Sequence, residues 1–172
     1  MKHIFLSGEK QVGKTTIIRE LLSRTGLTAD GFITFWELGS DHGGQLYLSP
    51  FFTGLSCEEK YLIVDRDKQQ RALPEKIMRV FNEKGCEILD NSGKRDVIVM
   101  DEIGFFESKA IGFQKSILRH ISGDVPILGV IKPAQTDFLD KIRSHPKVEV
   151  LEVTEENRNK NLEWILEMRE KL

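Results

Sequence analysis

The segment GEKQVGKTT at residues 8–16 constrains the fold of this chain more than any other. It matches the pattern G-x-x-x-x-G-K-[ST], whose fixed positions are filled by Gly8, Gly13, Lys14 and Thr15. The short apolar run at 3–7 that precedes it is typical of a buried strand. Apolar residues then recur at helical spacing up to Gly26, which is a suitable helix end. A strand, a glycine loop and a helix in this order predict the beginning of an α/β sheet.

The rest of the chain alternates strand patterns with helix patterns. Further strands are expected at 60–65, 96–102, 126–131 and 147–153, and helices at 73–85, 107–122, 136–145 and 157–170. The four adjacent apolar residues at 97–100 indicate a strand that is covered on both faces, as in a parallel sheet. Aromatic and β-branched segments on both sides of GSDHGG predict an inserted β-hairpin at about 31–53.

The composition of the 172-residue chain suits one globular domain over residues 1–172. Charged residues make up 30% of the sequence and hydrophobic residues 40%, which argues against a disordered chain. The formal net charge of -2 gives no general attraction to nucleic acid or to an anionic membrane. The N-terminal apolar run is too short for a signal peptide or a membrane span. We therefore expect a cytoplasmic protein without a nucleic-acid or membrane partner, and the sequence indicates no protein partner.

The cysteines and histidines show no metal-ligand spacing. Cys57 and Cys86 belong to no C-x-x-C pair, so we expect two reduced thiols rather than a zinc site. The four histidines are assigned no chemistry.

The glycine loop has the residue types that bind phosphate. Glycines allow successive backbone N–H groups to converge on one point, and the following helix adds the positive end of its dipole. Lys14 would reach the β- and γ-phosphates of a nucleotide, and the Thr15 hydroxyl would ligate Mg²⁺. The predicted nucleotide-binding residues are Gly8, Glu9, Lys10, Gln11, Val12, Gly13, Lys14, Thr15 and Thr16.

Two acids follow the buried strand VIVM. Asp101 is expected to hold the same Mg²⁺, and Glu102 is expected to polarise the water that attacks the γ-phosphate. The alternative is a pair of solvated charges at a strand end, and the phosphate loop in the same chain argues against it.

Four segments of the chain resemble those of the small nucleoside-triphosphatase family first described from thermophilic microbes, which includes the human cancer-related nucleoside-triphosphatase. They are GEKQVGKTT, GFITFWE, VIVMDEIG and FLDKIRSHPKVEVLEVTEENRN, so the resemblance runs from residue 1 to about 160. It implies a RecA-like P-loop domain with a mostly parallel sheet, dependence on Mg²⁺, and slow hydrolysis of several nucleoside triphosphates to diphosphate and phosphate. It also implies the phosphate-binding role of the loop, the metal role of Asp101 and the water-activating role of Glu102.

The chain departs from this family at two positions. The family usually has a lysine where this chain has Phe105, and a basic residue where it has Phe35. Both changes remove positive charge that could stabilise a phosphate transition state, and one such charge can be worth about 10³-fold in rate. The sequence therefore supports nucleotide binding more strongly than it supports fast turnover.

The source of another cation at the γ-phosphate is open. Lys132 follows the strand PILGVI, whose end should face the same side as Asp101, but it could also be a solvated lysine. Further candidates are Arg66, Arg119, Arg143 and Arg158. Asn157 and Arg158 could also line a wall for the base, or belong to a helix cap.

The aromatic residues leave similar alternatives. Those at 32–52 could bind a base or a partner, although alternating spacing is more typical of the buried face of a hairpin. Phe105 and Phe106 could close over a nucleotide or pack in the core.

These patterns predict a Mg²⁺-dependent nucleoside-triphosphatase with Lys14 and Glu102 as catalytic residues. The GTPase-type N-K-x-D motif is absent, so we expect ATP, GTP, CTP and UTP to be accepted with little base selectivity. Two alternatives remain. One is a small-molecule or nucleotide kinase with its acceptor site at the hairpin, and the other is a nucleotide-dependent switch protein with negligible turnover.

Overall fold

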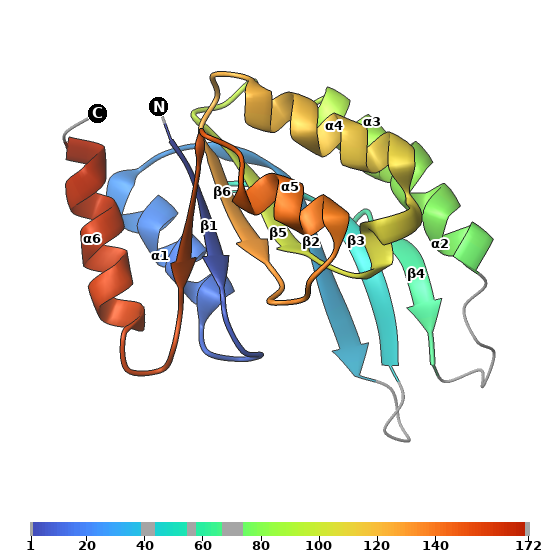
Figure 1. Ribbon diagram of the computed structural model, residues 1–172, viewed down its shortest axis with the longest axis horizontal. Coiled ribbons are helices and arrows are strands. Elements are labelled where there is room, and N and C mark those ends of the chain that lie inside the picture. The colour runs from blue at the N-terminus through green and yellow to red at the C-terminus, as the bar shows by residue number, and fades with distance from the viewer. Residues whose placement is uncertain (1, 39–43, 55–57, 67–73, 171–172) are drawn as a thin grey trace.

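One seven-stranded sheet forms the centre of the computed structural model, which describes residues 2–38, 44–54, 58–66 and 74–170 (Figure 1). The strand order is β4-β3-β2-β5-β6-β1-β7. The bounds are β1 His3–Ser7, β2 Ala29–Leu38, β3 Gly44–Phe52, β4 Tyr61–Asp65, β5 Val97–Ile103, β6 Ile127–Ile131 and β7 Val148–Glu152. Strands β2, β5, β6, β1 and β7 are parallel neighbours, whereas β3 and β4 add antiparallel pairs beyond β2. The expected mostly parallel α/β sheet is confirmed.

The central strands are apolar along their length because helices cover both of their faces. All five residues of β6 are buried, as are Val97 to Asp101 of β5. The hairpin predicted at about 31–53 is confirmed as β2 and β3, paired from Asp30 with Phe52 to Leu38 with Gly44. It is built into the sheet, because β2 also pairs in parallel with β5.

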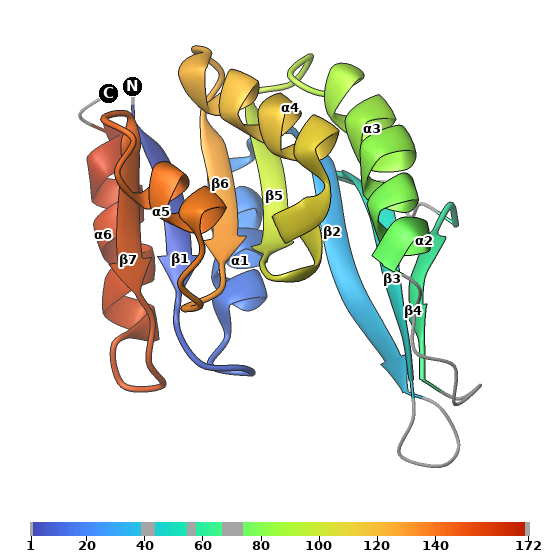
Figure 2. The same ribbon diagram turned by 45° about the vertical axis from the view of Figure 1, so that its right-hand side comes forward.

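Helices lie on the two faces of this sheet (Figures 1 and 2). Helices α1 (Lys14–Thr25) and α6 (Arg158–Glu170) cover one face, where the buried residues of α1 pack with those of β5 and β6. Helices α2 (Pro74–Val80), α3 (Cys86–Asp90), α4 (Ile111–Ser122) and α5 (Asp137–Arg143) lie on the other face, which holds the larger core cluster. No helix of the described residues is long and apolar enough to cross a membrane.

The helix predicted at 73–85 extends further than expected. A π-helical turn at Phe81–Gly85 joins α2 to α3, so helical structure continues to Asp90 and the predicted end at Gly85 is wrong. The glycine is required by packing instead, because a Cβ atom there would lie 2.6 Å from the ring of Phe113 on α4. Close approach of two helices, and not a helix end, explains this glycine.

The helix predicted at 107–122 begins later than expected. Residues Phe106–Lys109 form a 3-10 turn, and α4 starts only at Ile111. The carboxylate of Glu107 accepts a hydrogen bond from the Gly104 backbone N–H at 2.9 Å, which folds this segment back beside the end of β5. The Glu107 side chain therefore stabilises a turn at this segment, and the helix starts only after that turn.

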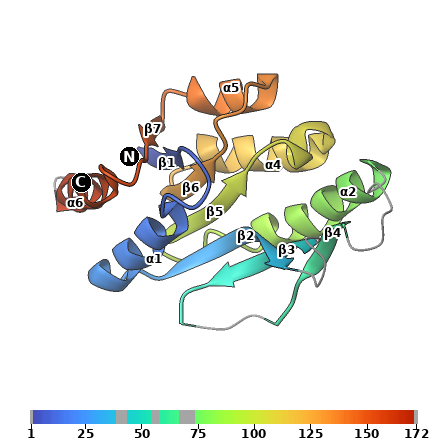
Figure 3. The same ribbon diagram turned by 90° about the horizontal axis from the view of Figure 1, so that it is seen from below.

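The carboxyl ends of the parallel strands meet at one edge of the sheet, which Figure 3 shows from below. The loop after β1, the acids at the end of β5 and the segment after β6 all lie at this edge. Ligands of open α/β sheets bind outside the carboxyl ends of the strands. The fold therefore collects the predicted site residues in one place.

Candidate functional site

The glycine loop between β1 and α1 has the backbone conformation that a phosphate loop needs. Gly8, Gln11 and Gly13 have positive φ angles of 140°, 64° and 97°. A Cβ atom on Gly8 would lie 2.2 Å from the Val153 carbonyl oxygen, so the position accepts only glycine. Gly13 precedes α1 directly, so the loop ends on the N–H groups of a helix start. The predicted loop is present as a curled turn; its binding of nucleotide stays a prediction.

Lys14 lies folded over this loop. Its Nζ donates hydrogen bonds to the carbonyl oxygen of Gly8 at 2.8 Å and to that of Glu9. Partial burial lowers the pKa of the Lys14 ammonium group, whereas the nearby Glu102 and Asp101 carboxylates raise it. The positive charge is thus held at the mouth of the loop, facing the acid pair.

Thr15 and Asp101 are in direct contact, although 86 positions separate them in the chain. The Thr15 hydroxyl donates a hydrogen bond to Asp101 Oδ2 at 2.8 Å. Asp101 is 5% exposed, and this burial raises the pKa of its carboxyl group to about 6, although the hydrogen bond from Thr15 lowers it. A bound cation would compensate the cost of keeping this carboxylate ionised. The pair therefore offers two adjacent oxygen ligands of the kind that Mg²⁺ takes.

Glu102 has a backbone conformation that the sequence did not reveal. Its φ angle is 72°, and the pairing of β5 with β6 shifts register between Met100 and Ile103. A non-glycine residue with positive φ is uncommon, and such strain concentrates at functional sites. The irregularity turns the Glu102 carboxylate towards the cavity, where Thr34 Oγ1 lies 3.4 Å from Glu102 Oε2.

Lys132 lies beside the acid pair, as its place after β6 predicted. Its Nζ is 3.3 Å from Glu102 Oε1, and its backbone N–H donates to the Ile103 carbonyl oxygen at 2.9 Å. Arg143 of α5 fixes the same segment, because one guanidinium nitrogen donates to the carbonyl oxygens of Lys132 and Ala134, both at 2.7 Å. Arg143 therefore stabilises the segment that follows β6, and it does not line the cavity.

A buried carboxylate stands behind the acid pair. Glu107 is 2% exposed, and desolvation raises the pKa of its carboxyl group to about 7, although hydrogen bonds from its own backbone N–H and that of Gly104 lower it. Gly104 in turn leaves room for the Lys132 side chain, because a Cβ atom there would lie 2.7 Å from Lys132 Cδ. Glu107 thus fixes the turn on which both Glu102 and Lys132 depend.

The loop and the acid pair line one open cavity of about 910 Å³. This volume lies within the range of small-molecule sites. The lining also includes Arg66, which follows β4 and was among the predicted cation candidates. Three further lining residues come from β2 and had not been connected with the loop by the sequence: Thr34, Trp36 and Leu38. Alternation along β2 is the signal that could have found them, since Thr34, Trp36 and Leu38 share one side of the strand.

The other predicted cation candidates lie outside this cavity. Arg119 pairs with Asp90. Arg158 lies behind the loop, since its side chain would be 3.6 Å from a Cβ atom on Gly13. Asn157 and Thr154 exchange hydrogen bonds between their side chains and backbones at the start of α6, so the helix-cap explanation of Asn157 is confirmed.

The aromatic residues separate into three groups. Phe32 is fully buried in the core, and Trp36 lines the cavity. Phe35 points to the other face of the sheet, where it stacks on Tyr47 with ring centroids 5.9 Å apart. Phe105 is 65% exposed and does not line the cavity, whereas Phe106 packs against the core. The two positions at which the family pattern has basic residues therefore do not face the loop.

Cys86 and His3 have structural surroundings. Cys86 is a free, half-buried thiol, and burial raises its pKa. His3 is buried; its Nε2 lies 2.8 Å from the Ile121 carbonyl oxygen, and its Nδ1 accepts from the Ile127 N–H. Cys57 and His42 lie outside the described residues.

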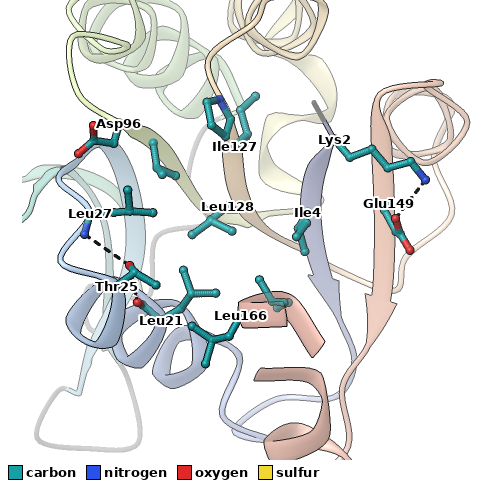
Figure 4. Close-up of a pocket in the computed structure, with 13 residues that line it drawn as sticks. Lys2, Ile4, Leu21, Thr25, Leu27, Asp96, Ile127, Leu128, Glu149 and Leu166 are labelled. Atoms are coloured by element: carbon teal, nitrogen blue, oxygen red, sulfur yellow. Dashed lines mark hydrogen bonds and ion pairs between the residues drawn. The ribbon is translucent and has the colours of Figure 1, made fainter. Parts of the chain in front are cut away.

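A second cavity lies at the amino ends of the parallel strands, between α1 and α6 (Figure 4). It measures about 510 Å³, and its wall is mostly aliphatic, with Ile4, Leu21 and Leu128 among the lining residues. Lys2 and Glu149 pair with each other at its rim, at 3.2 Å. An aliphatic wall does not suit a polyphosphate, so the cavity at the loop is the candidate nucleotide site.

Comparison with known proteins agrees with this geometry. The family model NTPase_1, described as NTPase, matches residues 3–166. The nucleoside-triphosphatase THEP1 of Aquifex aeolicus is 29% identical over 98% of this chain and 99% of that protein. The human cancer-related nucleoside-triphosphatase is 31% identical over 92% of this chain and 91% of that protein. The crystal structure of the Aquifex THEP1 aligns with a TM-score of 0.71 and 28% identity, covering 98% of both chains. The chain therefore belongs to the NTPase family, together with these nucleoside-triphosphatases.

Proposed function

We propose that this protein is a Mg²⁺-dependent nucleoside-triphosphatase that cleaves the terminal phosphate from ATP, GTP, CTP and UTP. The observation that carries the proposal is the 2.8 Å contact between the Thr15 hydroxyl and the Asp101 carboxylate. It joins the first turn after a phosphate loop to an acid at the end of a neighbouring strand, which is the arrangement that holds a metal-bound triphosphate. The names of the relatives support the same activity.

The loop residues would bind the phosphates. The backbone N–H groups of residues 8–16 and the start of α1 supply partial positive charge, and Lys14 supplies a full charge next to the terminal phosphate. Thr15 and Asp101 would hold Mg²⁺, which when bound neutralises charge on the β- and γ-phosphates. The described residues contain no cluster of three or more His, Cys, Asp or Glu side chains for a metal. This fits an ion that takes few protein ligands and relies on phosphate oxygens.

Glu102 would orient the attacking water and accept its proton. The water oxygen bonds to the γ-phosphorus while the bond to the bridging β–γ oxygen breaks, which yields nucleoside diphosphate and inorganic phosphate. Lys132 lies 3.3 Å from the same carboxylate and can stabilise charge beside it. Base selectivity is low in this proposal, because the chain lacks the N-K-x-D motif of GTPases.

Phosphate release from the four triphosphates, with Mg²⁺ and with EDTA in its place, tests this function. We expect release from all four with the metal and a loss of activity without it. Release that appears only after a nucleoside or another acceptor is added would contradict hydrolysis and indicate a kinase.

Glu102→Gln tests the assigned base. The amide keeps the size of the side chain but cannot take a proton, so we expect kcat to fall by about 10²–10⁴-fold while the Kd of the triphosphate stays within a few-fold. Glu83→Gln, at an exposed position of the π-helical turn, is a matched control and should keep the parent rate. Parent-like turnover by Glu102→Gln would show that another group activates the water.

A further inference from the structure

The cationic side chains that line the loop cavity differ in the contacts that they already make within the protein. Among the described residues they are Lys10, Lys14, Arg66 and Lys132. Lys14 donates to loop carbonyl groups, Lys132 pairs with Glu102, and Lys10 is an exposed residue of the loop itself. Arg66 differs from all three, because it follows β4, at the end of the sheet order away from β1 and its loop.

Arg66 is held against the indole ring of Trp36. Its Cζ atom lies 4.3 Å from the ring centroid, well within the range of a cation–π contact. Trp36 is half-buried and packs against the core, so its ring has a fixed position against which the Arg66 guanidinium group can pack. The Arg66 backbone N–H also donates to the Gly44 carbonyl oxygen at 3.0 Å. Both ends of the residue are therefore positioned before any ligand binds.

No carboxylate of the described residues pairs with Arg66. The chain pairs several other arginines: Arg24 with Glu163, Arg79 with Glu83, Arg119 with Asp90, and Arg143 with Asp140. A guanidinium group carries five N–H donors in its plane, and stacking on a ring uses its face rather than these donors. Arg66 thus presents in-plane donors and a full charge for an anionic ligand.

Arg66 and Glu102 contact residues on the same side of β2. Trp36 follows Thr34 by two residues and shares its side of β2, and the Thr34 hydroxyl lies 3.4 Å from Glu102 Oε2. A two-residue step along a strand covers about 7 Å. Arg66 and Glu102 both line the same cavity, so a phosphate group in it can be reached from both.

We propose that Arg66, positioned by Trp36, binds the terminal phosphate of the nucleoside triphosphate from the side opposite the loop. The inference rests on the proposed function, because it assumes a triphosphate in the loop. The loop holds the phosphate chain from the β1 side, so a group that comes from β4 meets the end that faces the acid pair. The charge-assisted hydrogen bonds of Arg66 stabilise the γ-phosphate oxygens as water adds and the bond to the bridging oxygen breaks.

Calorimetric titration of Arg66→Ala with two nucleotides in the presence of Mg²⁺ tests the contact without turnover. We expect the Kd of β,γ-imido-ATP, which carries a terminal phosphate, to rise about 10-fold or more, since a charged hydrogen bond is lost. The Kd of ADP should stay within about 2-fold, because it lacks that phosphate. Arg79→Ala removes an exposed arginine that pairs with Glu83 on the neighbouring helical segment, and should change neither value.

The kcat values of Arg66 and Trp36 variants give the second readout. We expect Arg66→Ala to lower kcat by about 10²-fold or more, and Arg66→Lys to restore it only in part, since an ammonium group lacks the planar donors. Trp36→Leu should shift both readouts in the same direction by less, and Trp36→Phe, which keeps an aromatic face, by less still. Thermal melting of each variant confirms that it is folded.

Two results would overturn the proposal. One is an unchanged Kd of the imido analogue in Arg66→Ala, and the other is an equal loss of affinity for ADP. A parent protein that binds the analogue but releases no phosphate contradicts the proposed hydrolysis instead, and the comparison of analogue with ADP still decides the role of Arg66.

Discussion

At the scale of single residues, the site depends on carboxylates kept in surroundings that disfavour their charge. Asp101 and Glu107 are both buried, and their pKa values rise to about 6 and about 7. Glu102 adds a backbone φ angle of 72° between them. Burial of the two carboxyl groups and the positive φ angle both cost free energy, and they are tolerated because neighbouring contacts fix the segment. These contacts come from the Thr15 hydroxyl, the Gly104 N–H and the Lys132 ammonium group. A cation bound beside Asp101 would offset the cost of keeping its carboxylate ionised.

Glu107 should give the free protein a measurable pH dependence of stability. Its carboxyl group has a pKa of about 7 in the folded protein against an ordinary value of 4.5, so the folded state binds more protons between these pH values. The free energy of unfolding therefore falls as the pH rises from about 4.5 through 7. Glu107→Gln removes this contribution, so we expect a flatter profile in urea unfolding without Mg²⁺ or nucleotide. Glu75→Gln, at an exposed position, should keep the parent slope, and an equally steep profile for Glu107→Gln would refute the assignment.

At the scale of elements, the continuous helical segment from Pro74 to Asp90 shows how packing overrides a local signal. Its glycine at 85 has helical φ and ψ angles of -62° and -43°, as an ordinary helix interior does. The ring of Phe113 fills the space beside it and stacks on Phe81, with centroids 5.2 Å apart. The π-helical turn ends at this contact, so local geometry and inter-helix packing are coupled.

Gly85→Ala should therefore destabilise the protein, although alanine is the better helix former. Helix propensity alone would stabilise the variant by about 1 kcal/mol. The new methyl group would meet a fully buried ring, and such overpacking costs about 1–3 kcal/mol. We expect a net loss of about 1 kcal/mol in the free energy of unfolding, measured by denaturant titration. Lys76→Ala on α2, an exposed position, should stay within about 0.5 kcal/mol of the parent. A variant as stable as the parent would show that the ring can move.

At the scale of the whole molecule, the sheet order determines which distant segments meet. Strand β6 lies between the loop-bearing β1 and the acid-bearing β5, so their carboxyl ends share one edge. The antiparallel strands β3 and β4 extend the sheet past β2 and bring Arg66 to the same cavity. The cavity is thus lined by the segments that follow β1, β4 and β6 and by residues of β2 and β5.

The sequence could predict the parts of this site that have local patterns. The loop at 8–16 and the acids after VIVM were found because a fixed spacing and a buried strand end mark them. The pairing of Arg66 with Trp36 has no local mark, since it arises from strand register and from a ring contact between two strands. The φ angle of Glu102 and the burial of Glu107 likewise follow from tertiary packing, which a single sequence does not display. The same limit explains why the helix end predicted at Gly85 and the helix start predicted at residue 107 are wrong.

A crystal structure of the protein with Mg²⁺ and β,γ-imido-ATP would show whether the glycine loop is the nucleotide site. We expect the triphosphate inside the loop at residues 8–16, with the metal ion between the Thr15 hydroxyl and the Asp101 carboxylate and the terminal phosphate facing Glu102. An analogue bound elsewhere, or a metal ion without contact to either Thr15 or Asp101, would contradict this expectation.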